Sequence, residues 1–303
     1  MNNTMKVLLC CILKLENHYL EEWVRHYKKL GIDKIVIYDN NDVDGEHIED
    51  ISFINEQISN NYIDVYKIPG EECVQIKCYN ECYKKYSDEY DWLMFFDIDE
   101  FLMLENNYNL KTCLSSQIYE CYDMIHVNWK CFDDNDILYA NNDYRLVERF
   151  TRPVYISKNI SGRDKEIKSI IRGGLSNIEF VNNPHTIKSR SLRCCNVLGH
   201  KENSLVQSSN SPIHKIMWLN HYICKTIEEY CTNKLKRLGG STSHIKGLRY
   251  NENFFWMYNI KTKEKLDLYY KLTNSQPCNK VEYTINANKE PKRIKSIFDK
   301  INN

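Results

Sequence analysis

The chain contains 303 residues, of which 42% are hydrophobic, and its 41 Lys and Arg residues balance 41 Asp and Glu residues. A net charge of zero provides no global attraction to nucleic acid or to an anionic membrane, and no apolar run approaches the roughly 20 residues that a membrane-spanning helix requires. The 13 cysteines are odd in number and include no CxxC pair, which favours buried thiols in a cytoplasmic protein over a zinc site or a disulfide framework.

The first hundred residues alternate strand-like and helix-like segments. Four apolar runs have the length and composition of strands that are buried on both faces of a sheet: 7–13, 34–38, 62–66 and the run that begins at Trp92. Between them, apolar residues recur at helical spacing over 20–30, before Gly31, and again from 71 to about 86. Strands that are separated by single helices predict βαβ units and a parallel sheet.

The pattern beyond residue 105 is less regular. Residues 124–129 and 168–172 are predicted to form further strands, and a helix is expected over 225–238, before Gly239 and Gly240. The last part of the chain alternates aromatic and basic residues without a clear period, and we predict that it is helical. The expected fold is therefore an α/β fold, with a mixed, mainly parallel sheet flanked by helices and a C-terminal helical extension.

An abrupt change from apolar to acidic residues marks the end of the fourth strand. Residues 92–96 are apolar, and Asp97, Asp99 and Glu100 follow. In an extended chain Asp97 and Asp99 point to the same side, and parallel sheets bind ligands beyond the carboxyl ends of their strands. Paired carboxylates suit Mg²⁺ or Mn²⁺, which in turn hold a phosphate group. The alternative is a solvated strand end, because Asp and Glu are common in loops.

Several blocks of this chain resemble glycosyltransferases of the GT-A fold, most closely the family 2 and family 92 branch with its bacterial transferases of surface polysaccharides. In chain order the blocks are 14–17, 20–23, 30–35, 38–41 with Asp44, 92–102, 148–150 with 168–171, and 182–185 with 220–222. Each block alone is weak. Their order and spacing over residues 5–240 make the resemblance specific.

The resemblance implies a GT-A (Rossmann-like) fold, a nucleotide-sugar donor, a divalent cation and inversion at the anomeric carbon. It places the catalytic domain at residues 1–240, with a nucleotide-sugar half at about 1–105 and an acceptor half at about 106–240, and leaves 241–303 as the helical extension. The donor would be a UDP-sugar, with galactose or another hexose as the best guess, and the metal would be Mn²⁺ or Mg²⁺. The acceptor would be a glycan or a lipid-linked glycan.

For the donor site, the resemblance points to residues at the ends of the first strands. Glu16 would accept hydrogen bonds from the ribose or the base, or would instead cap the helix that follows. Asp39 and Asn40 end the second strand beside it and would have a similar role. Gln75 and Lys77 would contact the donor, or would lie on a solvated helix face.

For the metal and the diphosphate, the resemblance assigns direct coordination chiefly to Asp99, while Asp97 would bind the ribose or a metal-bound water. His221 would complete the metal shell, because imidazole suits Mn²⁺, or would be a buried core residue. Lys168 would neutralise the diphosphate, or would merely flank a strand.

The transfer reaction needs a general base that takes the proton of the acceptor hydroxyl. The acidic segment after the strand at 124–129 resembles the acceptor side of the family, and Asp134 is the predicted base, with Glu148 as the second choice. Family members often carry Gly before this acidic residue, where the present chain has Asp133. That difference weakens the assignment of Asp134.

Two other functions stay open from the sequence alone. Haloacid-dehalogenase-type phosphatases also use an apolar strand that ends in Asp-x-Asp, which would make Asp97 a nucleophile, although they usually place the pair on the first strand. A non-catalytic sugar-binding module is the other alternative. The basic segment 280–303 predicts either an interfacial helix in peripheral contact with the inner face of the membrane or, as we prefer, a helix packed on the catalytic domain.

Overall fold

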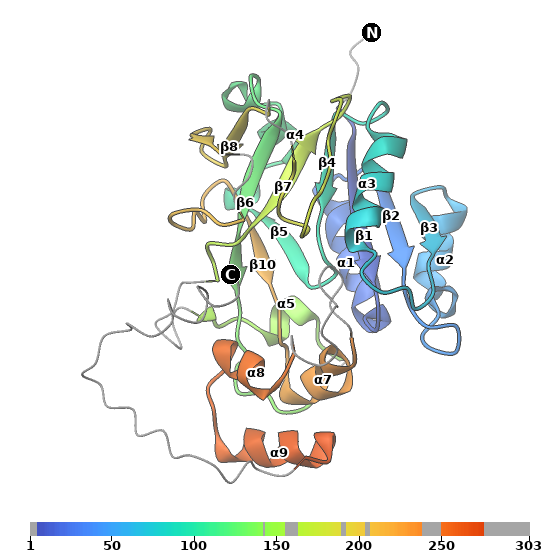
Figure 1. Cartoon of the computed structure of the whole chain (residues 1–303), viewed down its shortest axis with the longest axis vertical. Helices are drawn as coiled ribbons and strands as arrows, with labels where there is room; N and C mark the ends of the chain where they lie inside the picture. The colour runs from blue at the N-terminus through green and yellow to red at the C-terminus, as the bar shows by residue number, and fades with distance from the viewer. Residues whose placement is uncertain are drawn as a thin grey trace, which may run out of the picture.

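The computed structural model describes residues 5–141, 143–154, 163–188, 192–203, 207–237 and 250–275. Within these ranges one sheet dominates, with the strand order β3-β2-β1-β4-β7-β6-β10-β5, and β8 and β9 extend it beside β6 (Figure 1). The strands are β1 (Val7–Leu13), β2 (Lys34–Asp39), β3 (Ile63–Lys67), β4 (Trp92–Phe95), β5 (Glu100–Leu104), β6 (Met124–Cys131), β7 (Ile167–Arg172), β8 (Cys194–Asn196), β9 (Lys201–Glu202) and β10 (Met217–His221).

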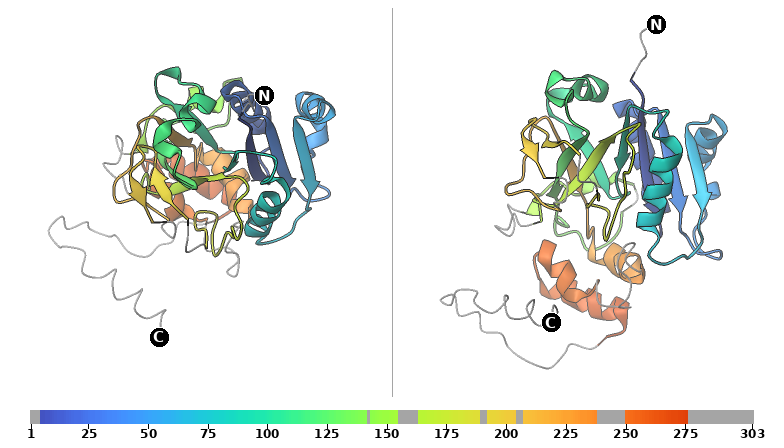
Figure 2. Two further views of the ribbon diagram at one scale, coloured as in Figure 1. Left: turned by 90° about the horizontal axis from the view of Figure 1, so that it is seen from above. Right: turned by 45° about the horizontal axis from the view of Figure 1, so that its top comes forward.

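Helices flank this sheet on both sides and extend below it in Figure 1. The α-helices are α1 (Asn17–Leu30), α2 (Ser52–Ser59), α3 (Gln75–Tyr86), α4 (Leu110–Leu114), α5 (Leu146–Arg149), α7 (Ile227–Thr232), α8 (Glu252–Tyr258) and α9 (Lys263–Thr273). Short 3₁₀ turns are η1 (Ile48–Asp50), η2 (Glu105–Asn107), η3 (Gln117–Tyr119) and η4 (Lys234–Lys236). Seen from above, α1 and α3 lie on opposite faces of the first strands (Figure 2).

The pairing directions divide the sheet into two halves. β1 is parallel to β2 and β4, and β2 is parallel to β3, as the alternation of strands and helices predicts. In the second half, β7 is antiparallel to β4 and β6, while β10 is parallel to β6 and antiparallel to β5. The sheet is thus mixed and mainly parallel, and this prediction from the sequence is confirmed.

The first strands are apolar along their whole length because a helix covers each face. Leu9 of β1 belongs to the same core as Trp23 of α1, whereas Leu8 belongs to a second core with Tyr79 of α3. The alternation of side chains along a strand explains this division. Gly31 ends α1 with a φ of 91°, a left-handed conformation that glycine adopts without strain.

The acidic segment after β4 forms a turn, which differs from the extended chain that the sequence suggested. β4 ends at Phe95, β5 begins at Glu100, and the backbone N–H of Glu100 donates to the carbonyl of Asp97 over 3.0 Å. The chain then leaves the centre of the sheet, because β5 pairs with β10 at the far edge. The acidic turn therefore lies where the two halves of the sheet diverge.

The C-terminal helices lie beyond the carboxyl ends of the first strands (Figure 1). The helix expected over 225–238 is shorter than predicted, since α7 ends at Thr232 and a 3₁₀ turn follows. Phe255 of α8 and Leu268 of α9 belong to the same core as the sheet, so these helices pack on the part of the chain that carries the sheet. The basic segment 280–303, with its predicted lipid contact, lies outside the described residues.

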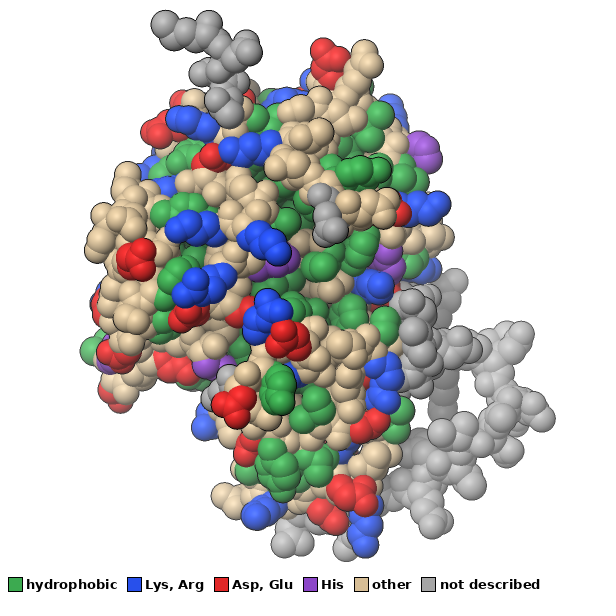
Figure 3. Space-filling model, turned by 180° about the vertical axis from the view of Figure 1, so that it is seen from behind, with side chains coloured by type: hydrophobic (Ala, Val, Ile, Leu, Met, Phe, Trp, Pro, Cys, Tyr) green, Lys and Arg blue, Asp and Glu red, His purple; other side chains and the backbone are tan. Residues whose placement is uncertain are grey.

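The surface charges and the cysteines are both as the composition predicts. Basic and acidic side chains are interspersed over the face shown in Figure 3. The 12 cysteines of the described ranges are free thiols, and most are buried. Burial raises the pKa of the Cys11 thiol well above its ordinary value, which suits an inert core residue. None of the described helices has the length and hydropathy needed to cross a membrane.

Candidate active site

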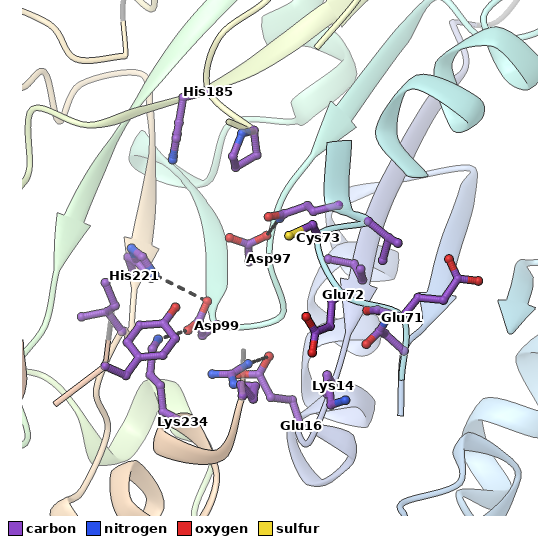
Figure 4. A pocket seen from close by; sticks show the side chains of 18 of the residues that line it. Lys14, Glu16, Glu71, Glu72, Cys73, Asp97, Asp99, His185, His221 and Lys234 are labelled. Carbon is purple, nitrogen blue, oxygen red and sulfur yellow. Dashed lines mark hydrogen bonds and ion pairs between the residues drawn. The ribbon is translucent and has the colours of Figure 1, made fainter. Parts of the chain in front are cut away.

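A cleft with a cavity volume of about 150 Å³ opens where the carboxyl ends of β1, β2 and β4 meet the C-terminal helices. Its lining comes from the ends of β1 and β2, the loop 70–75, the turn after β4, residues 184–185, the end of β10 and the segments around η4 and α8. Figure 4 shows Asp97 and Asp99 inside this cleft, with His221 and Lys234 beside Asp99. Both carboxylates of the Asp-x-Asp pair therefore face one cavity.

Helix α1 holds the acidic turn in place from behind. The indole N–H of Trp23 donates to the carbonyls of Asp97 (3.1 Å) and Glu100 (3.0 Å). The hydroxyl of Tyr27 donates to the same Glu100 carbonyl and accepts from the N–H of Leu102, each over 3.0 Å. The two aromatic side chains thus bind backbone groups of the turn, and they fix the turn and the direction of its carboxylates.

Asp97 is the more accessible carboxylate, with 30% of its side chain exposed. Its Oδ1 accepts hydrogen bonds from Gln75 (2.9 Å) and Tyr79 (3.1 Å), and its Oδ2 accepts one from Lys168 (2.9 Å). Burial alone would raise the pKa of Asp97, but the Lys168 ammonium outweighs it and lowers the pKa below the ordinary value. Asp97 is therefore an ionised acceptor at neutral pH.

Asp99 is almost fully buried among basic side chains. Lys234 lies 3.2 Å and Lys225 3.7 Å from its Oδ2, and Nε2 of His221 lies 3.5 Å from its Oδ1. Burial opposes ionisation, but Lys234 and Lys225 hold the pKa of Asp99 well below its ordinary value. Burial also lowers the pKa of His221, so its imidazole is neutral.

Glu16 lines the same cleft, as predicted for a donor contact. Its loop is held by Asn41, whose Oδ1 accepts the N–H of Leu15 over 2.8 Å. The Glu16 carboxylate receives Lys225 at 3.2 Å and Arg237 at 2.5 Å. Its side chain makes no capping hydrogen bond to α1, so the alternative role as a helix cap is not the one that the structure has.

The other predicted donor residues divide into two groups. Asn40 and Gln75 line the cleft, and the amide of Asn40 also donates to the carbonyls of Ile68 and Glu71, which shapes the loop that follows. Asp39, Lys77 and Lys168 are not among the residues that line it. Each of these three side chains instead contacts another residue of the chain.

Lys168 is fully buried behind the cleft between Asp97 and Glu100, which lie 2.9 and 3.5 Å from its ammonium. It cannot reach a diphosphate from there. Lys77 is 59% exposed and points to Glu71, and Asp39 accepts the backbone N–H of Asn41. The prediction that these three side chains contact the donor therefore finds no support in the geometry.

The two predicted catalytic carboxylates also lie away from the cleft lining. Asp134 is fully buried, and Lys265 of α9 lies 2.7 Å from its Oδ2. Glu148 is exposed on α5 and pairs with Arg145 in the same turn. A base must reach the acceptor hydroxyl, so neither side chain is placed for that role. Asp134 instead ties α9 to the segment that follows β6.

His185, from the block 182–185 of the family resemblance, also lies in the cleft. Its Nδ1 lies 2.6 Å from the carbonyl of Ile167, which requires a proton on Nδ1 and leaves Nε2 as an acceptor. Burial lowers the pKa of His185 to about 3. This neutral imidazole is suited to accept a hydrogen bond from a ligand hydroxyl.

The donor set does not fit the divalent ion that the sequence predicts at Asp97, Asp99 and His221. Within the described ranges, no three side chains of His, Cys, Asp or Glu converge closely enough to hold a metal ion. Lys168 and Lys234 occupy an oxygen of Asp97 and of Asp99, respectively. A divalent ion about 4 Å from an ammonium would be repelled by about 8 kcal/mol at an effective dielectric constant of about 20.

Sequence analysis missed the basic residues that meet the carboxylates, namely Lys225, Lys234 and Arg237. Lys234 and Arg237 are three positions apart within the predicted helix 225–238, a spacing that places two side chains on one face. This was the available signal. It could not show which of the many acidic residues in the chain would lie opposite.

Comparison with known proteins identifies the family to which this chain is similar. The sequence model of glycosyltransferase family 92 matches residues 6–276 of this chain. A glycosyltransferase family 92 protein of Arabidopsis thaliana is 32% identical over 98 residues, which are 32% of this chain and 16% of the plant protein. One of Oryza sativa subsp. japonica is 31% identical over 107 residues, 35% of this chain and 18% of that protein. The matched segments thus span less than a fifth of these plant proteins.

Solved structures show only distant likeness. Staphylococcus aureus TarS, residues 1–349, aligns with a TM-score of 0.36 and 13% identity over 55% of this chain and 47% of its own. A complex of GalNAc-T7 with UDP, GalNAc and Mn²⁺ aligns with a TM-score of 0.29 and 12% identity over 44% of this chain and 24% of its own. These scores add nothing to the fold that the strand order establishes. The family match, which includes α8 and α9, shows that the chain belongs to glycosyltransferase family 92.

Proposed function

We propose that this protein is an enzyme that transfers a sugar from a nucleoside diphosphate sugar to a hydroxyl group of a glycan or lipid-linked glycan. Membership of glycosyltransferase family 92 supports the reaction class. The observation that carries the proposal is the cleft itself, in which Asp97, Asp99 and Glu16 face basic side chains beyond the carboxyl ends of parallel strands. That is where a donor with both hydroxyl groups and phosphates would be bound.

The donor would lie along the ends of β1 and β2. Its nucleoside would contact Glu16 and Asn40, and Asp97 and the free nitrogen of His185 would accept hydrogen bonds from sugar hydroxyls. We propose a UDP-sugar, with galactose or another hexose as the sugar, and an acceptor of the bacterial surface-polysaccharide type. The free thiols support a reducing compartment, so we place the reaction in the cytoplasm.

The chemistry would be a single displacement with inversion. The acceptor oxygen bonds to the anomeric carbon, the bond from that carbon to the diphosphate oxygen breaks, and its electron pair leaves on the diphosphate. The acceptor proton passes to a base. Among the carboxylates, Asp97, Glu71 and Glu72 line the cleft and replace Asp134 and Glu148 as candidates for that base. The carboxylates that would bind Mn²⁺ or Mg²⁺ are already paired with lysines, Asp97 with Lys168 and Asp99 with Lys234.

The test is a transfer assay with the whole chain and a panel of UDP- and GDP-sugars, with release of the nucleoside diphosphate as the readout. We expect Asp97→Asn to lower the rate about 100-fold, the effect of misplacing a reacting group, while the fold survives. Asp267→Asn, which alters an exposed carboxylate of α9, is the matched control and should be unchanged.

Two outcomes would contradict the proposal. Release of phosphate from a phosphomonoester through a phospho-enzyme at Asp97 would support the phosphatase alternative. Sugar binding without turnover of any nucleotide sugar would support a non-catalytic binding module. The family match favours neither of these alternatives.

A further inference from the structure

We propose that Lys234 and Arg237 bind the diphosphate of the donor and provide the positive charge that the sequence pattern assigns to a divalent cation. This inference rests on the proposed function, because it names the groups that hold the leaving diphosphate at the same site. It predicts that a diphosphate binds to this protein when divalent ions are removed.

The basic side chains around the cleft form two layers. Lys168 and Lys225 lie behind the wall and are not among the residues that line it. Each joins two carboxylates: Lys168 joins Asp97 to Glu100, and Lys225 joins Glu16 to Asp99. These two lysines are therefore structural.

Lys234 and Arg237 form the front layer at Asp99 and Glu16, and both line the cleft. Lys14 lines the cleft too, but its ammonium lies 2.9 Å from Asp42. Lys234 meets Asp99 at 3.2 Å, and Arg237 meets Glu16 at 2.5 Å. Lys234 also lies 5.5 Å from the ring centre of Tyr250, which lines the cleft as well. Their charged groups are thus held at the cavity surface, on the side where Asp99 and Glu16 meet.

Around Asp99 and Glu16, the cations of the two layers together outnumber the carboxylates. Asp99 and Glu16 are two carboxylates, and three cations contact them: Lys225, Lys234 and Arg237. Because Lys225 already contacts both carboxylates, the two front cations can turn toward a ligand without leaving a buried carboxylate unpaired. Such an arrangement favours an anion that carries several oxygen atoms, and the planar fork of Arg237 matches phosphate oxygens.

A divalent ion would meet the opposite situation. To coordinate Asp99 through Oδ2 it would have to replace Lys234, while Lys225 stays 3.7 Å from the same oxygen. The neutral His221 is its nearest further ligand at this carboxylate. Two buried lysines beside one carboxylate oppose a metal ion and favour a diphosphate.

The first experiment measures the binding of UDP and of inorganic pyrophosphate to the whole wild-type chain by calorimetry, once in EDTA and once in Mn²⁺. We expect both probes to bind in EDTA, with Kd values within about threefold of those in Mn²⁺. Pyrophosphate is included because it reports on the diphosphate contacts whatever base the natural donor carries. This comparison needs no variant, so it stays decisive even if a substitution disturbs folding.

The second experiment compares variants in EDTA. Lys234→Ala and Arg237→Ala should each weaken the binding of both probes by at least about tenfold, as expected for the loss of a charge-assisted contact, and Arg237→Lys should restore part of the affinity. Lys236→Ala is the matched control: it removes the same charge from an exposed position of the same 3₁₀ turn, outside the cleft lining. Its affinity should equal that of the wild type.

The outcomes separate this inference from the proposed function. If UDP binds only in Mn²⁺ and the alanine variants at 234 and 237 bind as the wild type does, the inference is overturned while the donor site stands. If neither probe binds under either condition, the inference and the donor site both fall. Binding in EDTA that the two alanine variants lose and Lys236→Ala keeps supports the inference.

Discussion

At the scale of single residues, the carboxyl groups of one acidic turn differ in pKa because their surroundings differ. Glu100 is fully buried behind Asp97, and its Oε1 has no hydrogen-bond partner. Burial raises the pKa of Glu100 well above its ordinary value, although Lys168 opposes this. The same turn thus holds one carboxyl group with a raised pKa beside Asp97 and Asp99, whose pKa values are lowered.

This difference predicts unequal effects of two substitutions. Glu100→Gln should change the free energy of unfolding by less than about 1 kcal/mol, because a raised pKa favours the neutral acid, and a neutral amide has the same shape. Lys168→Met should lower it by about 3 kcal/mol, because Asp97 loses its cation. Urea denaturation measures both. Equal losses in the two variants would show that Glu100 is ionised.

At the scale of elements, α1 performs a task that its amphipathic pattern does not reveal. Its apolar face covers the sheet, as the spacing of Trp23 and Tyr27 predicts, but the same two side chains also bind the backbone of the acidic turn. The helix thus connects the packing of the core to the direction of Asp97 and Asp99.

Trp23→Phe tests this connection, because it keeps an aromatic ring in the core and removes two hydrogen bonds to the turn. We expect a loss of about 1–3 kcal/mol in unfolding free energy and a weakening of UDP binding by roughly tenfold, since a less rigid turn misplaces its carboxylates. Trp218→Phe in β10 is the control, since its indole donates to Asn220 outside the turn. Similar UDP affinity in both variants would count against a positioning role for α1.

At the scale of the whole molecule, β6 lies in the second half of the sheet, between β7 and β10, and carries a buried histidine. His126 pairs in register with Ser169 of β7 and Asn196 of β8, and its Nε2 has no hydrogen-bond partner. Burial lowers the pKa of His126 to about 4. In the unfolded chain this imidazole takes up a proton near pH 6.5, so unfolding binds a proton between these values.

These two pKa values set the direction in which pH changes the free energy of unfolding. Below about pH 6.5 the unfolded state binds more protons, so the free energy of unfolding should fall as the pH drops toward 4, by about 1.4 kcal/mol per pH unit for this residue. His126→Gln should reduce the slope, whereas His47→Gln, at an exposed position, should leave it unchanged. Urea denaturation at a series of pH values measures the slope. An identical slope in His126→Gln and wild type would show that the lowered pKa of His126 does not cause the pH dependence of stability.

The sequence by itself determined the features that depend on neighbours in the chain. Apolar runs and helical spacing located β1, β2, β4 and α1, and the order of short blocks indicated the family before any comparison. The Asp-x-Asp pair was expected at a ligand site because parallel sheets bind ligands beyond the carboxyl ends of their strands, and the family resemblance added Glu16 to the same site. These inferences need only local patterns, a general rule of sheet geometry and a likeness to known sequences.

The tertiary structure alone decided which charges meet. Asp99 pairs with Lys234, 135 residues away, and Asp134 with Lys265, 131 residues away, so one carboxylate lies in the cleft and the other is enclosed by α9. Ion pairs of this kind form wherever strand order and helix packing bring two segments within a few ångströms, and periodicity along the chain carries no record of that distance. For the same reason, Asp97 and Asp99, which were predicted to bind a metal, are found paired with lysines. Asp134, the predicted base, is found paired with Lys265 and holds α9 in place.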